Sequence, residues 1–299
     1  MSTSLQSDCD RLTAVLLAHP REAFVDVATV NTQWAALGYT APPDLARAVD
    51  EYDEFTAILE SAGASLHWLP RGAGTTIDSI YVRDAAIVCD RGIVLCRMGK
   101  PSRAGEPAAL EQGLAAAGLG DWPMAGRIEA PGTLEGGDVV WLGPRTIAVG
   151  RGYRTNDEGI RQLRAILGDG IDDLIVVPLP HWRGAGDVMH LMSLISPIDR
   201  DLAVVYAPLL PVPFRERLLD LGVGFVEVPD EEFDSLGANV LALAPRRCVI
   251  ARGNPRTVAA LERAGVDVIE YAGTEISLKG AGGPTCLTRP LARHVAAGM

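Results

Sequence analysis

Residues 137–150 read GDVVWLGPRTIAVG, and two other stretches have the same build: RDAAIVCDRGIVLC at 83–96 and ANVLALAPRRCVIA at 238–251. Each has an Asp or Asn near its start, continues through apolar residues, reaches a short turn containing Gly or Pro, and becomes apolar again. This pattern predicts a β-hairpin in each stretch.

Two fainter stretches, 190–196 and 285–291, fit the gaps in this series, so the same unit is predicted five times. Its starting positions recur about every 50 residues, which is typical of a supersecondary unit repeated around an axis. The starting residues are Asp84, Asp138, His190, Asn239 and Cys286. Repetition around an axis would bring several of these starts, together with Glu135, to one central point.

Helices and single strands are predicted between the hairpins. Apolar residues at helical spacing indicate helices at 43–60, 106–117, 156–167, 214–221 and 255–264. Asn156 is a predicted N-cap. Apolar strands follow four of these helices, at 65–69, 174–178, 224–229 and 266–271.

The predicted unit is therefore a helix, a strand and a hairpin, and a closed ring of five units would place helices outside and strands around the axis. A TIM barrel would need about eight strands, each followed by a helix, and five units with an additional hairpin do not match it. We expect a single domain over residues 1–299, because no linker or low-complexity tract interrupts the chain.

The composition excludes several classes of protein. The chain has 299 residues, of which 48% are hydrophobic, and a formal net charge of −11. No run of Lys or Arg suggests a nucleic-acid-binding surface, and no apolar run approaches the roughly 20 residues needed to cross a bilayer. The polar N-terminus does not resemble a signal peptide. We expect no nucleic-acid partner and no membrane segment.

The five cysteines suggest reduced thiols in a cytoplasmic protein, because no CxxC pair or Cys/His metal spacing occurs. Cys89, Cys96 and Cys248 fall inside predicted hairpins and are expected to be inert core residues. Cys9 is expected to be exposed in the N-terminal tail.

Cys286 follows the glycine-rich stretch 280–285. Glycines at 282 and 283 allow positive φ and close backbone approach, and backbone N–H donors beside a thiol lower its pKa and favour a nucleophile. The local sequence alone slightly favours a small hydrophobic residue at the start of a buried strand. The repeat register favours the nucleophile, because it aligns Cys286 with the polar starts of the other units.

Four acidic residues and one histidine are further candidates. His190 alone is typical of a hydrogen-bonded histidine at a strand end, but its register suggests an acid and base near neutral pH. Glu135 and Asp138 surround Gly-Gly at a strand entrance, where a turn needs only one Asp or Asn and Glu is a poor turn former. Asp78 and Asp84 fit either a site or an ordinary strand edge.

Arg103 and Arg154 each follow a hairpin and precede a helix. Arg suits bidentate binding of a carboxylate, although a solvated surface arginine is the simpler interpretation of each position alone. The stretch 280–284 does not fit a P-loop or GxGxxG, and no GxSxG elbow occurs, so a phosphate loop and a serine hydrolase are not expected.

Six motifs occur in a specific order and spacing: DSIYVRD at 78–84, RMGKPSR at 97–103, LEGGD at 134–138, RTN at 154–156, HL at 190–191 and GGPTC at 282–286. Together they resemble the guanidino-group modifying superfamily, whose pentein fold is an α/β propeller of five pseudo-symmetric units. The resemblance is closest to dimethylarginine dimethylaminohydrolases, with arginine deiminases and amidinotransferases as relatives, and it covers nearly the whole chain.

The resemblance implies three catalytic residues. Cys286 would attack the guanidinium carbon and form a covalent amidino-thioether. His190 would protonate the departing amine and then take a proton from water. Glu135 would orient His190 and help to hold the guanidinium.

The resemblance also implies the substrate-binding residues. Asp84 would bind guanidinium N–H groups, and Arg103 and Arg154 would bind the substrate carboxylate. Asp78 would position the amino-acid end, and Asp138 belongs to the same predicted set. No metal or organic cofactor is implied.

Two positions depart from these families. Arginine deiminases carry a carboxylate two residues after the histidine, where this chain has Met192, and the missing carboxylate favours a substituted guanidine over plain arginine. Arg83 precedes Asp84 where the dimethylarginine enzymes usually have Glu.

The resemblance predicts a cytoplasmic, cofactor-free hydrolase that converts an N-methylated arginine to citrulline and an amine. The alternatives are an arginine deiminase, an amidinotransferase acting on arginine or another guanidine, and a non-catalytic pentein binding protein. The predicted partners are a small-molecule guanidino substrate and, as an option, a second copy of the chain in a homodimer.

Overall fold

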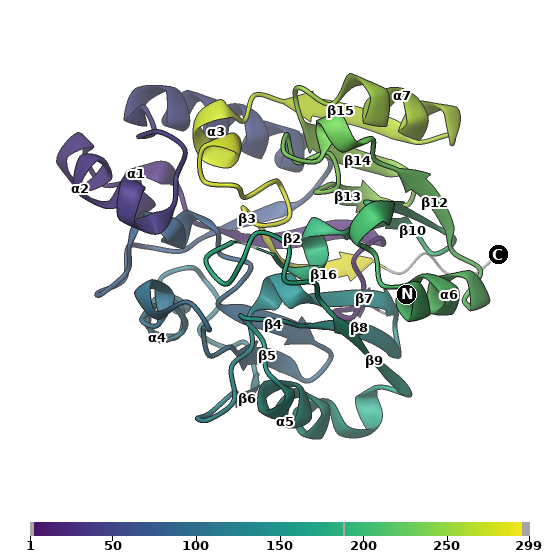
Figure 1. Ribbon diagram of the computed structural model, residues 1–299. Helices are drawn as coiled ribbons and strands as arrows, with labels where there is room; N and C mark the ends of the chain where they lie inside the picture. Colours follow the sequence, from purple (N-terminus) through teal and green to yellow (C-terminus); the bar gives the residue numbers. More distant parts are fainter. Residues whose placement is uncertain (1–2, 188, 295–299) are drawn as a thin grey trace.

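The computed structural model describes residues 3–187 and 189–294 of the chain (Figure 1). Its strands are β1 Thr3–Ser4, β2 Arg11–Leu17, β3 Ser65–Trp68, β4 Ala86–Cys89, β5 Gly92–Leu95, β6 Met124–Arg127, β7 Val139–Gly143, β8 Thr146–Arg151, β9 Asp173–Pro178, β10 Ile195–Asp199, β11 Leu202–Val205, β12 Gly224–Glu227, β13 Leu241–Ala244, β14 Arg247–Ala251, β15 Asp267–Tyr271 and β16 Arg289–His294. Its α-helices are α1 Pro20–Ala23, α2 Val27–Leu37, α3 Leu45–Ser61, α4 Glu106–Gly113, α5 Asp157–Leu167, α6 Val212–Asp220 and α7 Pro255–Arg263.

The strands of this part of the chain form five small sheets. Four have three strands each, in the orders β4-β5-β6, β7-β8-β9, β10-β11-β12 and β13-β14-β15, and the fifth has the order β1-β16-β2-β3. In Figure 1, helices α3 to α7 lie around the outside of the molecule and the sheets lie toward its centre.

Each three-stranded sheet combines one hairpin with one later strand. In β7-β8-β9 the hairpin strands are antiparallel, with Val139 opposite Val149, and β9 lies parallel to β8, with Val149 opposite Val176. Parallel neighbours need a crossover connection, which α5 provides. The pairing therefore groups each strand with the hairpin before its helix, whereas the sequence pattern predicts the grouping helix, strand, hairpin.

The fifth sheet joins the two ends of the described chain. β16 pairs antiparallel with β2, with Arg289 opposite Leu16, and β2 pairs parallel with β3, with Val15 opposite Leu66. The stretch 285–291 therefore contributes to one strand rather than to a hairpin, because its partner strand lies near the N-terminus. This pairing closes the ring, so the predicted five-unit α/β propeller is confirmed and a TIM barrel is excluded.

The predicted helices and single strands are present, with shifts at their ends. Asn156 caps α5 as predicted, because its side chain accepts a hydrogen bond from the Gly159 N–H at 2.8 Å. α4 ends at Gly113, before the predicted end at 117. β2, α2 and β6 are additional elements that the repeat pattern does not predict.

The hairpin strands form the buried centre of the ring, and the third strands are more exposed. Every residue of β4, β5 and β11 is buried, whereas β6 and β12 have exposed ends. Strands buried on both faces need the near-continuous apolar runs that the hairpin sequences contain. The helices close the core from outside, and α5 does so with Ile160, Leu163 and Leu167.

Four cysteines lie in the interior. Cys89, Cys96 and Cys248 are buried as expected. Cys9 is also buried, which contradicts its predicted exposure. The reason is that residues 6–10 are all buried rather than forming an exposed tail.

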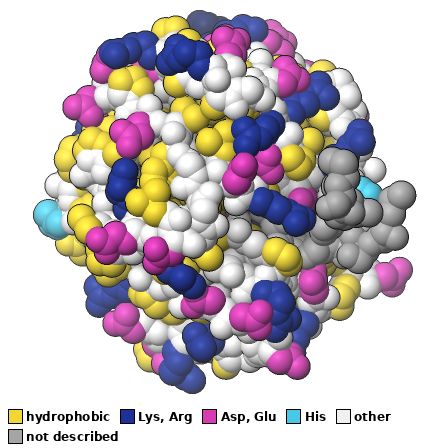
Figure 2. Space-filling model, turned by 90° about the vertical axis from the view of Figure 1, so that its right-hand side faces the viewer, with side chains coloured by type: hydrophobic (Ala, Val, Ile, Leu, Met, Phe, Trp, Pro, Cys, Tyr) yellow, Lys and Arg dark blue, Asp and Glu magenta, His cyan; other side chains and the backbone are white. Residues whose placement is uncertain are grey.

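Charges of both signs are mixed on the face of the molecule that Figure 2 shows. There, acidic and basic side chains are interspersed with scattered hydrophobic ones. Within residues 3–187 and 189–294, no helix combines the length and apolar character needed to span a bilayer.

Gly136 lies where two units of the ring touch, and the structure leaves no room for a side chain there. A Cβ atom at this position would lie 2.1 Å from the carbonyl oxygen of Arg83 and 2.8 Å from that of Ala86. We expect Gly136→Ala to lower the free energy of unfolding by about 2 kcal/mol or more, measured by urea denaturation, because backbone atoms would have to move. Gly143→Ala is the control, since a Cβ there would meet nothing within 4 Å, and equal losses in the two variants would contradict the prediction.

Candidate active site

The five unit starts lie at corresponding positions in the five sheets, just before β4, β7, β10, β13 and β16. They are Asp84, Asp138, His190, Asn239 and Cys286. The structure brings His190 and Cys286 to the walls of the same two cavities. The cysteine and the histidine therefore meet although 96 positions separate them in the sequence.

The first cavity is rich in charge and has a volume of about 120 Å³. Besides Cys286, its lining includes the ionisable residues Asp78, Tyr81, Asp84, Lys100, Arg103, Arg154, Asp187 and His190. The second cavity, of about 100 Å³, shares Asp187, His190, Ala281 and Cys286 with the first. Its apolar lining consists of Trp182, Met189, Met192, Phe233, Leu236 and Ala238, in addition to Ala281. Cys286 and His190 therefore lie between a charged space and a largely apolar one.

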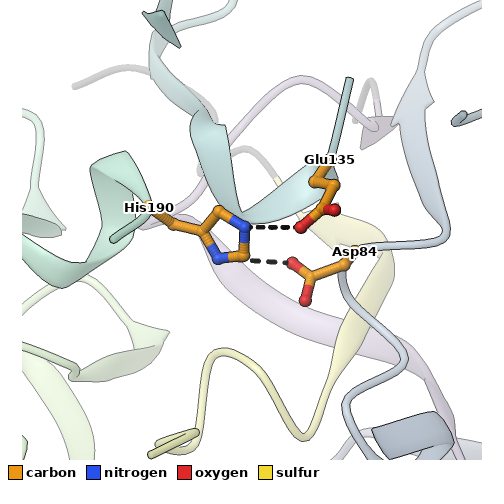
Figure 3. Close-up of side chains that lie close together, drawn as sticks. All are labelled: Asp84, Glu135 and His190. Atoms are coloured by element: carbon orange, nitrogen blue, oxygen red, sulfur yellow. Dashed lines mark hydrogen bonds and ion pairs between the residues drawn. The ribbon is translucent and has the colours of Figure 1, made fainter. Parts of the chain in front are cut away.

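Two buried carboxylates hold the imidazole of His190 (Figure 3). Glu135 Oε2 lies 2.7 Å from His190 Nε2, and Asp84 Oδ1 lies 3.8 Å from His190 Nδ1. Burial alone would lower the pKa of His190, but the charges of Asp84, Asp138 and Glu135 outweigh it and raise that pKa to about 9. His190 is therefore an imidazolium at neutral pH and carries a proton that it can donate.

Glu135 is ionised because its environment supplies donors to both carboxylate oxygens. The backbone N–H groups of Gly99 and Lys100 donate to Oε1 at 2.9 and 3.0 Å, and Arg154 Nη1 donates to Oε2 at 3.1 Å. Burial alone would raise the pKa of Glu135, but the hydrogen bond and charge of His190, with the charge of Arg154, hold it well below its usual value.

Asp84 is fixed by a backbone donor and by a buried ion pair. The Gly137 N–H donates to Oδ1 at 2.9 Å, and Arg103 Nη1 donates to Oδ2. Burial would raise the pKa of Asp84, but the charges of His190 and Arg103 lower it. Asp84 therefore presents a fixed negative charge to the first cavity.

Arg103 does not have the free donors that carboxylate binding requires. Its Nε and Nη2 donate to the two carboxylate oxygens of Glu106 at 2.8 and 2.7 Å, and Nη2 also donates to the Tyr81 carbonyl at 2.9 Å. Together with Asp84, these acceptors engage four of its five N–H groups. Arg103 is thus placed to position Asp84, in contrast to its predicted role as a carboxylate ligand.

Arg154 lines the first cavity, and most of its N–H groups have no hydrogen-bond partner among the described residues. Its one hydrogen bond there is from Nη1 to Glu135. Asp78 also lines this cavity, where Lys100 Nζ contacts its Oδ2 at 2.7 Å. Arg154 and Asp78 thus both line the cavity that contains Cys286.

Asp138 lies behind His190 rather than at the cavity wall. It accepts hydrogen bonds from Thr155 Oγ1 at 2.6 Å and from the Leu191 N–H at 3.0 Å. Burial raises the pKa of Asp138 to about 6. These contacts anchor the backbone next to His190, so they differ from the predicted substrate-binding role.

The thiol of Cys286 has a raised pKa, in contrast to the expected lowering. Burial is the largest cause and the charge of Asp84 adds to it, while contact with the Thr285 hydroxyl, the charge of Arg83 and a hydrogen bond from Asn239 act in the opposite direction. Backbone N–H donors, which the sequence suggested, are replaced by these side chains. The free site therefore favours the neutral thiol.

Asn239 is a site residue for which the sequence suggested no chemical role. Its Nδ2 donates to Cys286 Sγ at 3.5 Å, and its Oδ1 accepts from the Thr285 N–H and Oγ1 at 3.0 and 2.9 Å. The two bonds from Thr285 determine which end of the Asn239 amide faces the sulfur. The signal for Asn239 was present in the repeat, because it is one of the five unit starts.

The glycines before Cys286 allow the predicted close approach. A Cβ at Gly282 would lie 2.3 Å from the Tyr81 ring, and one at Gly283 would lie 2.4 Å from Asn239 Oδ1. The positive φ in this loop occurs at Ala281 (57°) instead.

Of the two residues that depart from the family pattern, Arg83 and Met192, only Met192 lines a cavity that contains Cys286. Arg83 does not line either cavity: it is buried, its side chain pairs with Asp8 at 2.6 Å, and its backbone N–H donates to the Cys286 carbonyl oxygen at 3.3 Å. Met192 is buried and lies on the apolar wall of the second cavity.

The cluster of Asp84, Glu135 and His190 has donor atoms within 4.8 Å of one another, as a metal site would. Its surroundings fit a metal poorly. A ligating histidine must be deprotonated, whereas these carboxylates raise the pKa of His190 to about 9. Guanidinium groups of Arg103 and Arg154 already occupy oxygens of the two carboxylates.

Comparisons with known proteins give a consistent picture. A family model described as arginine deiminase matches residues 77–214 and 212–293. The N(G),N(G)-dimethylarginine dimethylaminohydrolase of Streptomyces coelicolor is 33% identical over 217 residues, which are 71% of this chain and 73% of that protein. An arginine deiminase of Rhodococcus erythropolis is 32% identical over 54% of this chain, and the match spans only 46% of that protein.

Solved structures share the fold. The dimethylarginine dimethylaminohydrolase of Pseudomonas aeruginosa, as a cysteine-to-serine mutant complexed with citrulline, superposes with a TM-score of 0.74 at 26% identity, covering 94% of this chain and 99% of that one. The amidinotransferase SxtG of Microseira wollei has a TM-score of 0.79 at 17% identity and covers 99% of both chains, which shows a common fold.

Removing the charge of Glu135 should lower the pKa of His190. We expect Glu135→Gln to bring it from about 9 to below about 8, because burial would then be opposed by fewer negative charges. An NMR pH titration of the imidazole resonances measures this change. Glu158→Gln, which removes an exposed carboxylate paired with Arg161, is the control and should leave His190 unchanged. A pKa that stays near 9 in Glu135→Gln would contradict the electrostatic account.

Proposed function

The chain belongs to the arginine deiminase family, and on that premise we propose that it is a cysteine-dependent hydrolase that converts an N-methylated arginine to citrulline and an amine. The observation that carries this proposal is that Cys286 and His190 line the same cavities, with His190 held between Asp84 and Glu135. Two relatives, of whose length this chain covers 73% and 89%, are dimethylarginine dimethylaminohydrolases.

The first half of the proposed reaction forms a covalent intermediate. Cys286 Sγ, as the thiolate, attacks the guanidinium carbon, and the bond from this carbon to the methylated nitrogen breaks. His190, which is protonated at neutral pH, donates its proton to the departing amine. The product of this half is an amidino-thioether on Cys286.

The second half consumes water. His190, now neutral, takes a proton from a water molecule as the water oxygen attacks the same carbon. The carbon–sulfur bond then breaks, which returns the thiolate, and the added oxygen loses its remaining proton to solvent, which leaves the neutral ureido group of citrulline. Glu135 acts by holding the imidazole in place for both proton transfers.

Substrate charge supplies the activation that the free thiol lacks. A bound guanidinium would offset the negative charge of Asp84, which is one cause of the raised pKa of Cys286. The same cation would interact favourably with the fixed carboxylate of Asp84. We therefore propose that binding of the cationic substrate lowers the pKa of Cys286 and promotes loss of its proton.

The second cavity favours a substituted guanidine over plain arginine. Met192 stands where arginine deiminases have a carboxylate, and with Met189 and Phe233 it forms part of an apolar wall beside Cys286 and His190. N-methyl groups gain from contact with such a wall.

Two further properties belong to the same proposal. A cytoplasmic location is supported by five free thiols, which persist in reducing compartments. Association of the chain into a homodimer stays a prediction.

The reaction can be tested directly by product analysis. Asymmetric dimethylarginine should yield equal amounts of citrulline and dimethylamine, and Cys286→Ser should lower kcat by at least about 1,000-fold. Cys248→Ala, which removes a core thiol outside both cavities, is the control. Higher kcat/KM for arginine would indicate a deiminase, and an amidino product with added glycine would indicate a transferase. No turnover of any guanidine would leave only a binding protein.

Replacing Asp84 should change the rates at which two thiol reagents label Cys286 in opposite directions. Asp84→Asn removes a charge that raises the pKa of Cys286, so neutral iodoacetamide should label Cys286 about three-fold faster or more at pH 7.5. Cationic chloroacetamidine should react about ten-fold more slowly or worse, because its carboxylate partner is lost. Mass spectrometry of time courses gives both rates, with the exposed Asp121→Asn as control. Changes of the same sign for both reagents would contradict the proposed role of Asp84.

A further inference from the structure

Lys100 places its own ammonium group at the wall of the first cavity. Its Nζ donates to Asp78 Oδ2 at 2.7 Å and to the carbonyl oxygen of Leu37 at 3.0 Å. Lys100, Asp78 and Leu37 all line this cavity together with Cys286 and His190. The Lys100 side chain retains 20% of its exposure, and that of Asp78 only 5%.

A carboxylate and a carbonyl oxygen converging on one point are the acceptors that an ammonium ion needs. Here the ammonium that occupies them belongs to the protein. Asp78 is then already neutralised by Lys100, so a substrate ammonium that came to the same point would find its acceptors in use. The role that the resemblance gives to Asp78, which is to position the amino-acid end of the substrate, is therefore altered in this chain.

The remaining donors of this wall suit an anion. An ammonium has three N–H groups, and Lys100 uses two of them, which leaves one. Arg154 has one hydrogen bond in the described structure, to Glu135. Arg103 is engaged by Asp84 and Glu106 and contributes little. Lys100 and Arg154 thus each have a donor that can face an anion at this wall.

Lysine is rare in this chain, so the presence of a lysine at position 100 needs a physical reason. Of 27 Lys and Arg residues, only Lys100 and Lys279 are lysines. A compact ammonium can enter a small site made of two oxygens, where a planar guanidinium with five donors would not fit the same acceptors. Both lysines do this, since Lys279 Nζ contacts Glu275 and the Pro42 carbonyl.

We propose that the enzyme recognises ω-guanidino carboxylic acids by their guanidinium and carboxylate groups, and that Lys100 takes the place of a substrate α-ammonium. This inference rests on the proposed function and defines its substrate class by the guanidinium and carboxylate groups. A methylated arginine is then bound through its two ends, and its α-ammonium contributes little. A guanidino acid that lacks the α-amino group is bound equally well, and a decarboxylated guanidine is bound poorly.

Binding of three unreactive ureido ligands tests the inference separately from catalysis. The ligands are citrulline, 5-ureidopentanoate, which lacks the α-amino group, and 4-ureidobutylamine, which lacks the carboxylate. We expect calorimetry to give Kd values for the first two within about three-fold of each other, and a Kd for the third at least about ten-fold higher. Lys100→Met should free Asp78 and the Leu37 carbonyl, so the preference for citrulline over 5-ureidopentanoate should rise by about ten-fold or more.

Lys279→Met is the matched control, because it removes the other lysine from a similar pair of acceptors outside both cavities. It should leave the ligand preference unchanged. Lys100→Gln serves as a second variant if Lys100→Met does not fold, with folding checked by circular dichroism. Three results would overturn the inference: a wild-type preference of ten-fold or more for citrulline over 5-ureidopentanoate, an unchanged preference in both Lys100 variants, or no binding of any of the three ligands. The expected binding pattern without turnover of the corresponding guanidines would instead contradict the proposed function alone.

Discussion

The imidazole of His190 is held between two buried carboxylates, and much of the surrounding structure satisfies the charges of this cluster. Buried ions are costly unless they are paired and their remaining hydrogen-bonding groups are occupied. Arg103 and Glu106 extend the cluster behind Asp84, and Arg154 and the backbone N–H groups of residues 99 and 100 complete Glu135. Because these partners come from different units of the ring, the cluster requires the closed propeller.

The same cluster affects the protonation of both Cys286 and His190. Burial, together with the negative charge of Asp84, raises the pKa of Cys286, while the surrounding carboxylates raise the pKa of His190. Cys286 and His190 are then both protonated, and a cation near the sulfur is needed to lower the pKa of the Cys286 thiol. A guanidinium substrate brings that cation, so selectivity for charge and activation of the thiol have one physical origin.

Much of the fold and part of the site could be predicted from local patterns. The hairpins, the flanking helices and the cap at Asn156 follow from periodicity and turn chemistry within short windows. The alignment of unit starts placed Asp84, His190 and Cys286 at equivalent positions before any contact was known. The exposure of Cys9 was predicted wrongly, because the burial of residues 6–10 depends on packing inside the ring and not on their polar sequence.

The sequence by itself determined the repeat, the elements of each unit and the set of residues at the unit starts, because these depend on neighbours along the chain. Only the tertiary structure decided which partners the charged groups take. The pairing of β16 with β2, the ion pair of Arg103 with Asp84 and the contact of Lys100 with Asp78 all join segments whose spacing carries no local signal. Such choices depend on burial and on competition among acceptors in three dimensions, where one oxygen can serve one strong donor at the expense of another.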